Sequence, residues 1–178
     1  MKKKIDVYEH MGEILKGVKS GVLVTGKDEN KINSMTISWG MVGIEWGKPV
    51  FVTFIRESRF TRGLIEKNGE FTVNIPIDES AKKILAFCGS KSGRDVDKAK
   101  ELGLTYEEPE TISVPGIREL PLTLECKVIY KQTQDTSAMT EENREKFYPQ
   151  NVDSTFTGSN RDTHVAYYGE IVNAYIID

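Results

Sequence analysis

The fold of this chain is decided by the stretch Pro49-Val50-Phe51-Val52-Thr53-Phe54-Ile55, which leads directly into Arg56-Glu57-Ser58-Arg59-Phe60-Thr61-Arg62. The first part is almost entirely apolar, which predicts a strand covered on both faces. The second part predicts a helix over residues 59–67, with Ser58 as its N-cap and Asn68-Gly69 as its stop. A buried strand that opens into a helix N-terminus is therefore the centre of the predicted domain.

Other strands and short helices flank this centre. On its N-terminal side the pattern predicts a helix over residues 7–16 that ends at Gly17, a strand over 21–26, a turn over 28–31 and a strand over 33–40. On its C-terminal side it predicts a strand over 70–75, helices near 80–88 and 95–102, and strands over 122–130 and 164–177. Asp95 is the expected cap of the second of these helices, and Gly103 is its expected terminator.

These elements predict a mainly β fold. At least six strands with only short helices between them favour a closed or nearly closed antiparallel barrel, because the crossovers are too few for a doubly wound parallel sheet. The length of 178 residues suits a single domain over 1–178 and leaves no room for a separate nicotinamide-binding lobe. Residues 133–162 form a polar excursion with a short helix at 140–146, which we expect to be either a lid over a site or a mobile segment.

Charge and hydropathy argue against two classes of partner. The chain has 24 Lys and Arg against 27 Asp and Glu, so a net charge of −3 provides no general attraction to nucleic acid. No apolar run approaches the ~20 residues that a membrane helix needs. The basic start, Met1-Lys2-Lys3-Lys4, is not followed by the apolar core of a signal peptide. We therefore expect a cytoplasmic protein with no membrane partner.

The sequence predicts no metal site. His10 and His164 are the only histidines, which excludes a multi-histidine centre. Cys88 and Cys126 lack metal-ligand spacing and form no Cys-x-x-Cys pair. Both are expected to be buried free thiols.

The helix opening at residues 56–62 is a candidate anion site. Free N–H groups at a helix N-terminus favour negative charge. Ser58 and Thr61 would add hydroxyl donors, while Arg56 and Arg59 would add planar guanidinium groups that suit phosphate oxygens. The same residues also suit a capped surface helix with solvated arginines, and that alternative stays open.

Two further segments could face a ligand. The strand near 34–41 mixes hydroxyl residues with Trp39 and ends among glycines, which often mark the close approach of a ligand. Its apolar residues could equally belong to the core. The stretch 87–95 is a Gly/Ser turn with two cations, and Lys98 lies one turn beyond it. This turn could face a phosphate or could simply connect two helices.

Several of these segments, in this order, resemble one known family. The resemblance is carried by Asn33-Ser34-Met35-Thr36-Ile37-Ser38-Trp39, by 49–61, by Phe71-Thr72-Val73-Asn74-Ile75-Pro76, by 92–98 and by the strand that His164 opens. Together they resemble the flavin-reductase-like, FMN-binding split-barrel family, and within it the flavoredoxin branch. The resemblance covers about residues 12 to 177.

The resemblance implies an antiparallel split β-barrel of Greek-key type with short peripheral helices, and a homodimer with FMN near the subunit interface. The residues that would run beside the flavin ring are Met35, Thr36, Ile37, Ser38 and Trp39. Those at the phosphate would be Arg56, Ser58, Arg59 and Thr61, with Phe60 in the same cofactor-binding segment. Those around the phosphate or ribityl chain would be Ser92, Gly93, Arg94 and Lys98.

The resemblance also implies a redox function. Family members transfer electrons between reduced nicotinamide, flavin and other acceptors, so we expect an FMN-dependent oxidoreductase that uses NAD(P)H, with His164 in contact with the nicotinamide nucleotide. Related reductases carry Gly-Asp-His where this chain has Asp162-Thr163-His164, which leaves room for a protein electron donor. The alternatives are a non-enzymatic electron carrier that docks a partner protein and a flavin-binding module without turnover.

Overall fold

The computed structural model of the chain describes residues 1–153 and 161–178 and contains ten strands. The strands are β1 (Lys2–Lys4), β2 (Val22–Lys27), β3 (Ile32–Ile37), β4 (Gly40–Glu45), β5 (Lys48–Arg56), β6 (Glu70–Ile75), β7 (Tyr106–Glu107), β8 (Gly116–Ile117), β9 (Leu122–Thr133) and β10 (His164–Ile177). The helices are α1 (Val7–Ser20), α2 (Phe60–Asn68), α3 (Lys82–Ser90), α4 (Lys98–Leu102) and α5 (Glu141–Phe147), with short 3₁₀ turns η1 (Glu79–Ala81) and η2 (Thr136–Ala138). None of the helices in the described residues is long and apolar enough to cross a membrane.

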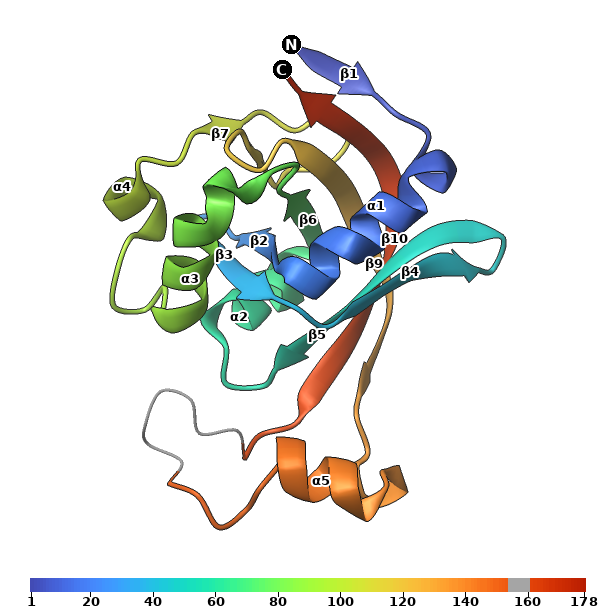
Figure 1. The fold of residues 1–178 in the computed structure, drawn as a ribbon, viewed down its shortest axis with the longest axis vertical. Coiled ribbons are helices and arrows are strands. Elements are labelled where there is room, and N and C mark those ends of the chain that lie inside the picture. Colours follow the sequence, from blue (N-terminus) through green and yellow to red (C-terminus); the bar gives the residue numbers. More distant parts are fainter. Residues whose placement is uncertain (154–160) are drawn as a thin grey trace.

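The main sheet is a split barrel. Its antiparallel strands follow the order β3-β2-β6-β9-β10-β5-β4, and β1 adds to β10. The two edge strands, β3 and β4, are consecutive in the chain and are separated only by Ser38-Trp39. A sheet whose edges are joined by two residues must curl until those edges approach, as Figure 1 shows. We call this junction of β3 and β4 the seam, and the mainly β fold class is confirmed.

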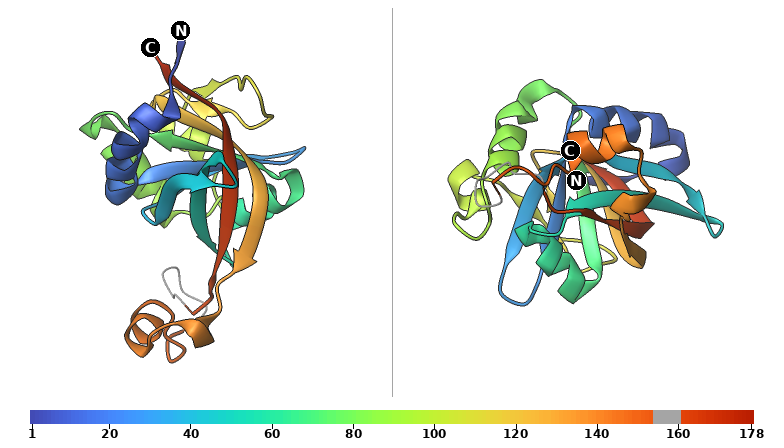
Figure 2. Two further views of the ribbon diagram at one scale, coloured as in Figure 1. Left: turned by 90° about the vertical axis from the view of Figure 1, so that its right-hand side faces the viewer. Right: turned by 90° about the horizontal axis from the view of Figure 1, so that it is seen from below.

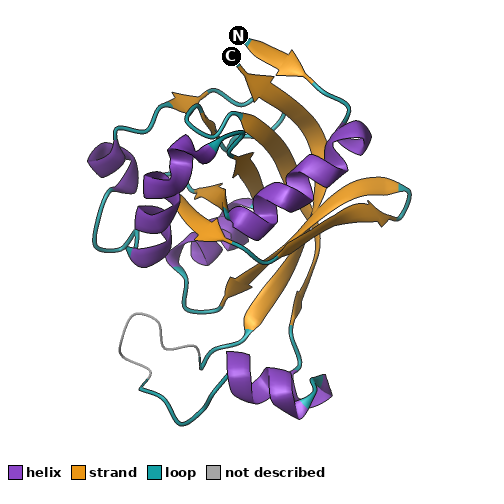
Figure 3. Ribbon diagram, viewed as in Figure 1, coloured by secondary structure: helices purple, strands orange, loops and turns teal. Residues whose placement is uncertain are grey.

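Helices α1, α2, α3 and α4 pack against the outside of the sheet (Figure 3). Helix α1 crosses over β4 and β6, and its buried Ile14 and Val18 join a core that includes Phe51 and Phe71. Helices α2 and α3 pack on β2 and β3. The strand at 49–55 is apolar because it is covered on both faces, as predicted: most of its residues are buried.

Four local predictions were wrong for physical reasons. Helix α1 continues through Gly17 to Ser20. Gly17 is explained by close packing and not by a helix end, since an added Cβ would lie 2.5 Å from Ile75 Cγ2. The strand predicted over 33–40 stops at Ile37, where the chain passes to the opposite sheet edge. Arg59, not Ser58, is the N-cap of α2, and Asp97, not Asp95, caps α4.

The polar excursion leaves the barrel at the end opposite the chain termini. Figures 1 and 2 show α5, in orange, beyond the ends of β9 and β10. The short helix predicted at 140–146 is α5, with Thr140 as its N-cap, and no residue of η2 or α5 is buried. The part of the predicted lid at 154–160 lies outside the described residues.

Candidate functional site

Two adjoining cavities open at the seam. The seam cavity, of about 270 Å³, is lined by Met35, Thr36, Ile37, Ser38, Trp39, Phe54, Arg56, Arg59 and His164. The helix-end cavity, of about 360 Å³, contains Ser58, Arg59, Phe60, Thr61, Ser92, Gly93, Arg94 and Lys98 in its wall. Met35, Thr36 and Arg59 line both. Every predicted site residue therefore lines at least one of the two adjoining cavities. Their combined volume suits a small-molecule ligand.

The edge of β3 offers backbone groups to this space. β3 pairs with β2 on one side only. The carbonyl of Ser34 points to the free side, where it accepts a hydrogen bond of 2.9 Å from Lys98 Nζ. Because alternate residues of a strand direct their backbone groups to the same side, the N–H and C=O of Thr36 also face the free edge. The side chain of Thr36 is fixed by donation to the Leu85 carbonyl at 2.6 Å. A flat heterocycle can therefore be hydrogen-bonded along Thr36.

The start of α2 carries an uncommitted cation. The N-cap, Arg59, has an extended backbone, and no side chain caps the helix N-terminus. Within the described residues, no hydrogen bond or ion pair engages the Arg59 guanidinium. Free helix N–H groups and an unpaired guanidinium at one cavity wall form an arrangement that favours an anion.

Two of the predicted cations are already engaged. Arg56 is 7% exposed, and its guanidinium donates to the carbonyls of Asp162 (2.6 Å) and Phe147 (2.8 Å). Burial lowers the pKa of Arg56, as it does that of Lys98, whose ammonium donates to Ser34 and Cys88 carbonyls. Arg56 thus joins the end of α5 and the segment before β10 to β5, and Lys98 joins α4 to β3. Both line the cavities, but their donors are directed to main-chain carbonyls.

The 92–95 turn is held against α2. Arg94 donates to the Ser58 carbonyl at 3.0 Å and lies over the Phe60 ring. Gly93 fits tightly, since an added Cβ would lie 2.2 Å from Asn33 Oδ1 and 2.7 Å from Phe60 Cδ1. Phe60 therefore shapes the wall by packing.

The two predicted hydroxyl residues, Thr61 and Ser58, differ in burial and in their hydrogen bonds. Thr61 is 1% exposed, and its Oγ1 accepts a hydrogen bond of 2.8 Å from Asn33 Nδ2. Ser58 is exposed, and its backbone N–H donates to Asp162 Oδ2 at 2.8 Å. This carboxylate explains why Ser58 is not the helix cap: its backbone is tied to the segment before β10.

His164 lies at the far wall of the seam cavity, paired with Arg56 across β10 and β5. Its Nδ1 is 2.7 Å from the Tyr148 hydroxyl, which donates to Gln134 Oε1 at 2.7 Å. The ring lies 5.0 Å from that of Trp39, and Trp39 packs edge-on against Phe147 at 5.1 Å. Burial, reinforced by the positive charge of Arg56, lowers the pKa of His164 to about 4. The imidazole is therefore neutral at pH 7.

Several residues of the site were not predicted from the sequence. Asn33, on β3, and Phe54, on β5, line the cavities. Tyr148, directly after α5, and Asp162, before β10, contact lining residues. Asn33 begins the motif already thought to run beside the ligand, so its position was a usable signal, whereas Phe54 stood in a strand predicted to be covered on both faces. The sequence carried no signal for Tyr148, because its contact with His164 depends on the path by which the excursion returns to the barrel.

Both cysteines are buried free thiols, as expected. Cys88 lines the helix-end cavity, and burial raises the pKa of its thiol. The pKa of the Cys126 thiol in the core is also raised by burial. Neither thiol is therefore activated as a thiolate.

Comparison with known proteins agrees with this architecture. Residues 15–178 match the model of the flavin reductase like domain. An uncharacterized protein of Archaeoglobus fulgidus is 33% identical over 120 residues, which cover 67% of this chain and 66% of that protein. The curated relatives are matched over only 58–66% of their own length.

Solved structures show the same fold. A flavoredoxin from Methanosarcina acetivorans superposes with a TM-score of 0.64 and 25% identity, covering 89% of this chain and 68% of its own. A flavoredoxin of Desulfovibrio vulgaris (Miyazaki F) superposes with a TM-score of 0.65 at 21% identity, over 89% of this chain and 69% of its own. With the family model matching nearly the whole chain, this protein belongs to the flavin reductase like domain family.

Proposed function

We propose that the chain is an FMN-dependent oxidoreductase that accepts electrons from NAD(P)H and passes them to free flavin or another acceptor. The observation that carries this proposal is the pair of connected cavities at the seam, one beside a free strand edge and the other at an uncapped helix N-terminus. The family match and the flavoredoxin neighbours support a flavin as the ligand.

The residues present fit FMN. The flavin ring would lie along β3, where Thr36 presents backbone N–H and C=O groups and Trp39 and Met35 present apolar surface. The phosphate would lie at the α2 N-terminus beside Arg59, whose guanidinium has no partner among the described residues. Arg94 and Gly93 would border the chain that joins ring and phosphate.

Bound flavin would supply the hydride and electron transfer itself. The chain's own residues would bind and orient it, with β3 backbone groups favouring negative charge on the ring. His164 lies at the opposite wall of the seam cavity and would contact the second substrate there. No side chain needs to act as a nucleophile.

A visible spectrum of the purified protein with added FMN tests the cofactor, and stopped-flow mixing with NADH and NADPH tests the reaction. We expect a bound-flavin spectrum that bleaches rapidly with at least one dinucleotide. Bound flavin that neither dinucleotide reduces would favour the electron carrier or the binding module instead. Absence of any bound-flavin spectrum would contradict all three.

We also propose that two copies of the chain pair through the outer face of β4, β5, β10 and β9. On this face the strand register aligns Met41, Val52, Tyr168 and Tyr130 in one row. The solvent side of an antiparallel barrel is ordinarily polar, so an apolar row across four strands favours burial by a partner. Trp46 extends the patch at the hairpin tip: it packs on Tyr130, is 60% exposed and has a positive φ of 50°.

A second copy fits this face better than a charged partner. The ion pair at its rim, Lys48 with Glu170 at 2.7 Å, is neutralised within the chain, so like charges do not oppose self-association. Phe54 belongs both to the apolar cluster of this face and to the seam cavity. Pairing here would therefore place the interface beside the flavin, as the family resemblance implies.

The test is the mass of the protein in solution by light scattering. We expect a dimer, which Met41→Lys converts to monomer. Ile77→Lys is the matched control, because Ile77 is 56% exposed against 58% for Met41 but lies away from this face. A wild-type monomer, or a Met41→Lys dimer as stable as the control, would contradict the proposal.

A further inference from the structure

The excursion supplies a hydrogen-bond chain that sets the protonation of His164. The Tyr148 hydroxyl has a single proton and donates it to Gln134 Oε1 at 2.7 Å. The same oxygen lies 2.7 Å from His164 Nδ1 and can only accept there. Nδ1 therefore carries the hydrogen of the neutral ring, and Nε2 carries the lone pair.

Nε2 is left without a protein partner in the part of the chain that the structure describes. His164 is 7% exposed, with Tyr148 at its Nδ1 edge and Trp39 against its ring. His164 lines the seam cavity, and because Tyr148 covers its Nδ1, the edge left to meet a ligand there carries Nε2. Nε2 is not among the fully buried, unpaired polar atoms of the described residues, so a ligand in the cavity can reach it and donate to it. A ligand that covered Nε2 without donating to it would leave a buried acceptor unpaired, which is costly.

The charges around His164 keep it neutral. Arg56 lies on the neighbouring strand with its guanidinium over the Tyr148 ring at 5.1 Å, and Arg59 faces the ring from the start of α2. Asp162 is the only acidic group that acts on His164 among the described residues, and it is hydrogen-bonded to the Ser58 N–H. Two cations against one satisfied carboxylate oppose a further positive charge on the imidazole.

We propose that Tyr148 and Gln134 are positioning residues that hold His164 with Nε2 as an acceptor for an N–H donor of the second substrate, as in a nicotinamide carboxamide. This rests on the proposed function for the identity of that substrate. The proposal also assigns a role to the excursion, because its residues Gln134 and Tyr148 orient His164 in the seam cavity. A substrate without the N–H would leave Nε2 buried and unpaired, at a cost of about tenfold or more in binding.

The tautomer of His164 can be measured without any cofactor. The chain has only two histidines, so ¹⁵N-histidine NMR of wild type and His10→Gln assigns both rings. We expect His164 in the Nδ1–H form in the wild type and loss of that preference in Tyr148→Phe. Tyr8→Phe is the control, because Tyr8 is 49% exposed on α1 and lines neither cavity. A wild-type Nε2–H ring, or a Tyr148→Phe ring that keeps the Nδ1–H form, would overturn the proposal.

Substrate choice gives the second readout. We expect NADH to reduce bound FMN with a KM at least about tenfold lower than its reduced 3-acetylpyridine analogue, which replaces the amide N–H with a methyl group. Tyr148→Phe should reduce this preference mainly through KM, while Tyr8→Phe should keep it. Equal KM values in the wild type would overturn the specificity role. If neither dinucleotide reduces the flavin, the proposed nicotinamide reaction fails, and the NMR result still decides whether Tyr148 positions His164.

Discussion

Replacing Arg59 by Gln should weaken FMN binding by about ten- to hundredfold. A charge-assisted hydrogen bond contributes roughly 1.5–3 kcal/mol, and each 1.4 kcal/mol is about tenfold in affinity. Because the Arg59 guanidinium has no partner within the described residues, its removal breaks no internal contact. The loss should therefore appear in binding and leave the free energy of unfolding nearly unchanged.

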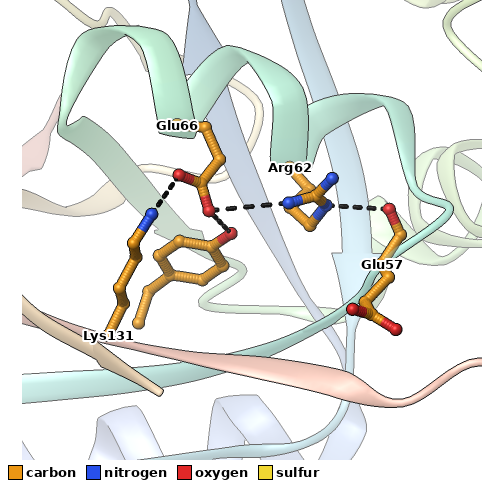
Figure 4. A network of polar contacts seen from close by, with 5 residues as sticks. Glu57, Arg62, Glu66 and Lys131 are labelled. Atoms are coloured by element: carbon orange, nitrogen blue, oxygen red, sulfur yellow. Dashed lines mark hydrogen bonds and ion pairs between the residues drawn. The ribbon is translucent and has the colours of Figure 1, made fainter. Parts of the chain in front are cut away.

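Arg62 provides the matched control on the same helix. Figure 4 shows its guanidinium engaged with the Glu57 carbonyl at 2.8 Å and with Glu66 at 3.5 Å. Glu66 also accepts hydrogen bonds from Lys131 and, at 2.6 Å, from the Tyr167 hydroxyl, which ties α2 to β9 and β10. Arg62→Gln should thus cost some stability but change FMN affinity less than about threefold, since its donors are already occupied.

The assay is titration of apo-protein with FMN and with riboflavin, followed by flavin fluorescence at two salt concentrations. Riboflavin lacks the phosphate, so Arg59→Gln should bind it as well as the wild type does. The FMN affinity of the wild type should also fall more with added salt than that of Arg59→Gln, because the guanidinium–phosphate attraction is screened. The reasoning would be refuted if Arg59→Gln bound FMN normally, or if it lost riboflavin affinity to the same extent as FMN affinity.

Two other predictions concern stability. Gly93→Ala should destabilise the fold by about 1–3 kcal/mol in urea unfolding, because its Cβ would overlap Asn33 and Phe60. Gly63→Ala in α2 is the control: an added Cβ meets no atom within 4 Å, so this variant should be as stable as the wild type or more stable. Equal stabilities of the two variants would contradict the close packing at Gly93. The pKa of His164 is lowered from its ordinary 6.5 to about 4, so its stabilising effect is complete above pH 6.5 and is lost as pH falls towards 4. Between pH 7.5 and 4.5 the wild type should lose about 2–3 kcal/mol more stability than His164→Gln in denaturant titrations, and parallel losses would show that the imidazole is not neutral and buried.

Local patterns were enough to predict most of the barrel. Apolar runs and alternation identified the strands at 49–55 and 70–75, and Gly69 and Gly103 end their helices in the left-handed conformation, as glycines at those positions predict. The break at Ser38-Trp39 was missed because alternation continues through it while the hydrogen-bonding partner changes from β2 to β5. Sheet closure is a property of the whole barrel, and a local pattern does not contain it.

The sequence predicted which residues line the cavities better than it predicted what each of them does there. Residue type identified Arg56, Arg59 and Lys98 as candidate cations, and all three line the cavities. Sequence could not distinguish them, because the carbonyls that engage Arg56 lie about a hundred residues away, at Phe147 and Asp162. Only the folded chain shows which cation is left for a ligand.

This division among the cations would let the two adjoining cavities serve both parts of the proposed function. A site that attracts phosphate needs positive charge, yet a positive charge on His164 would turn its acceptor into a donor. Directing Arg56 to the carbonyls of Phe147 and Asp162 keeps its charge beside His164, where it opposes protonation, while Arg59 stays available at the start of α2. The excursion supplies Phe147 and Tyr148 together, so the same segment that engages Arg56 also orients the imidazole. Deleting residues 135–161 should therefore change the His164 tautomer and remove the Phe147 carbonyl from Arg56, while the Asp162 carbonyl stays in place. The His164 NMR spectrum and the FMN titration measure these two effects independently.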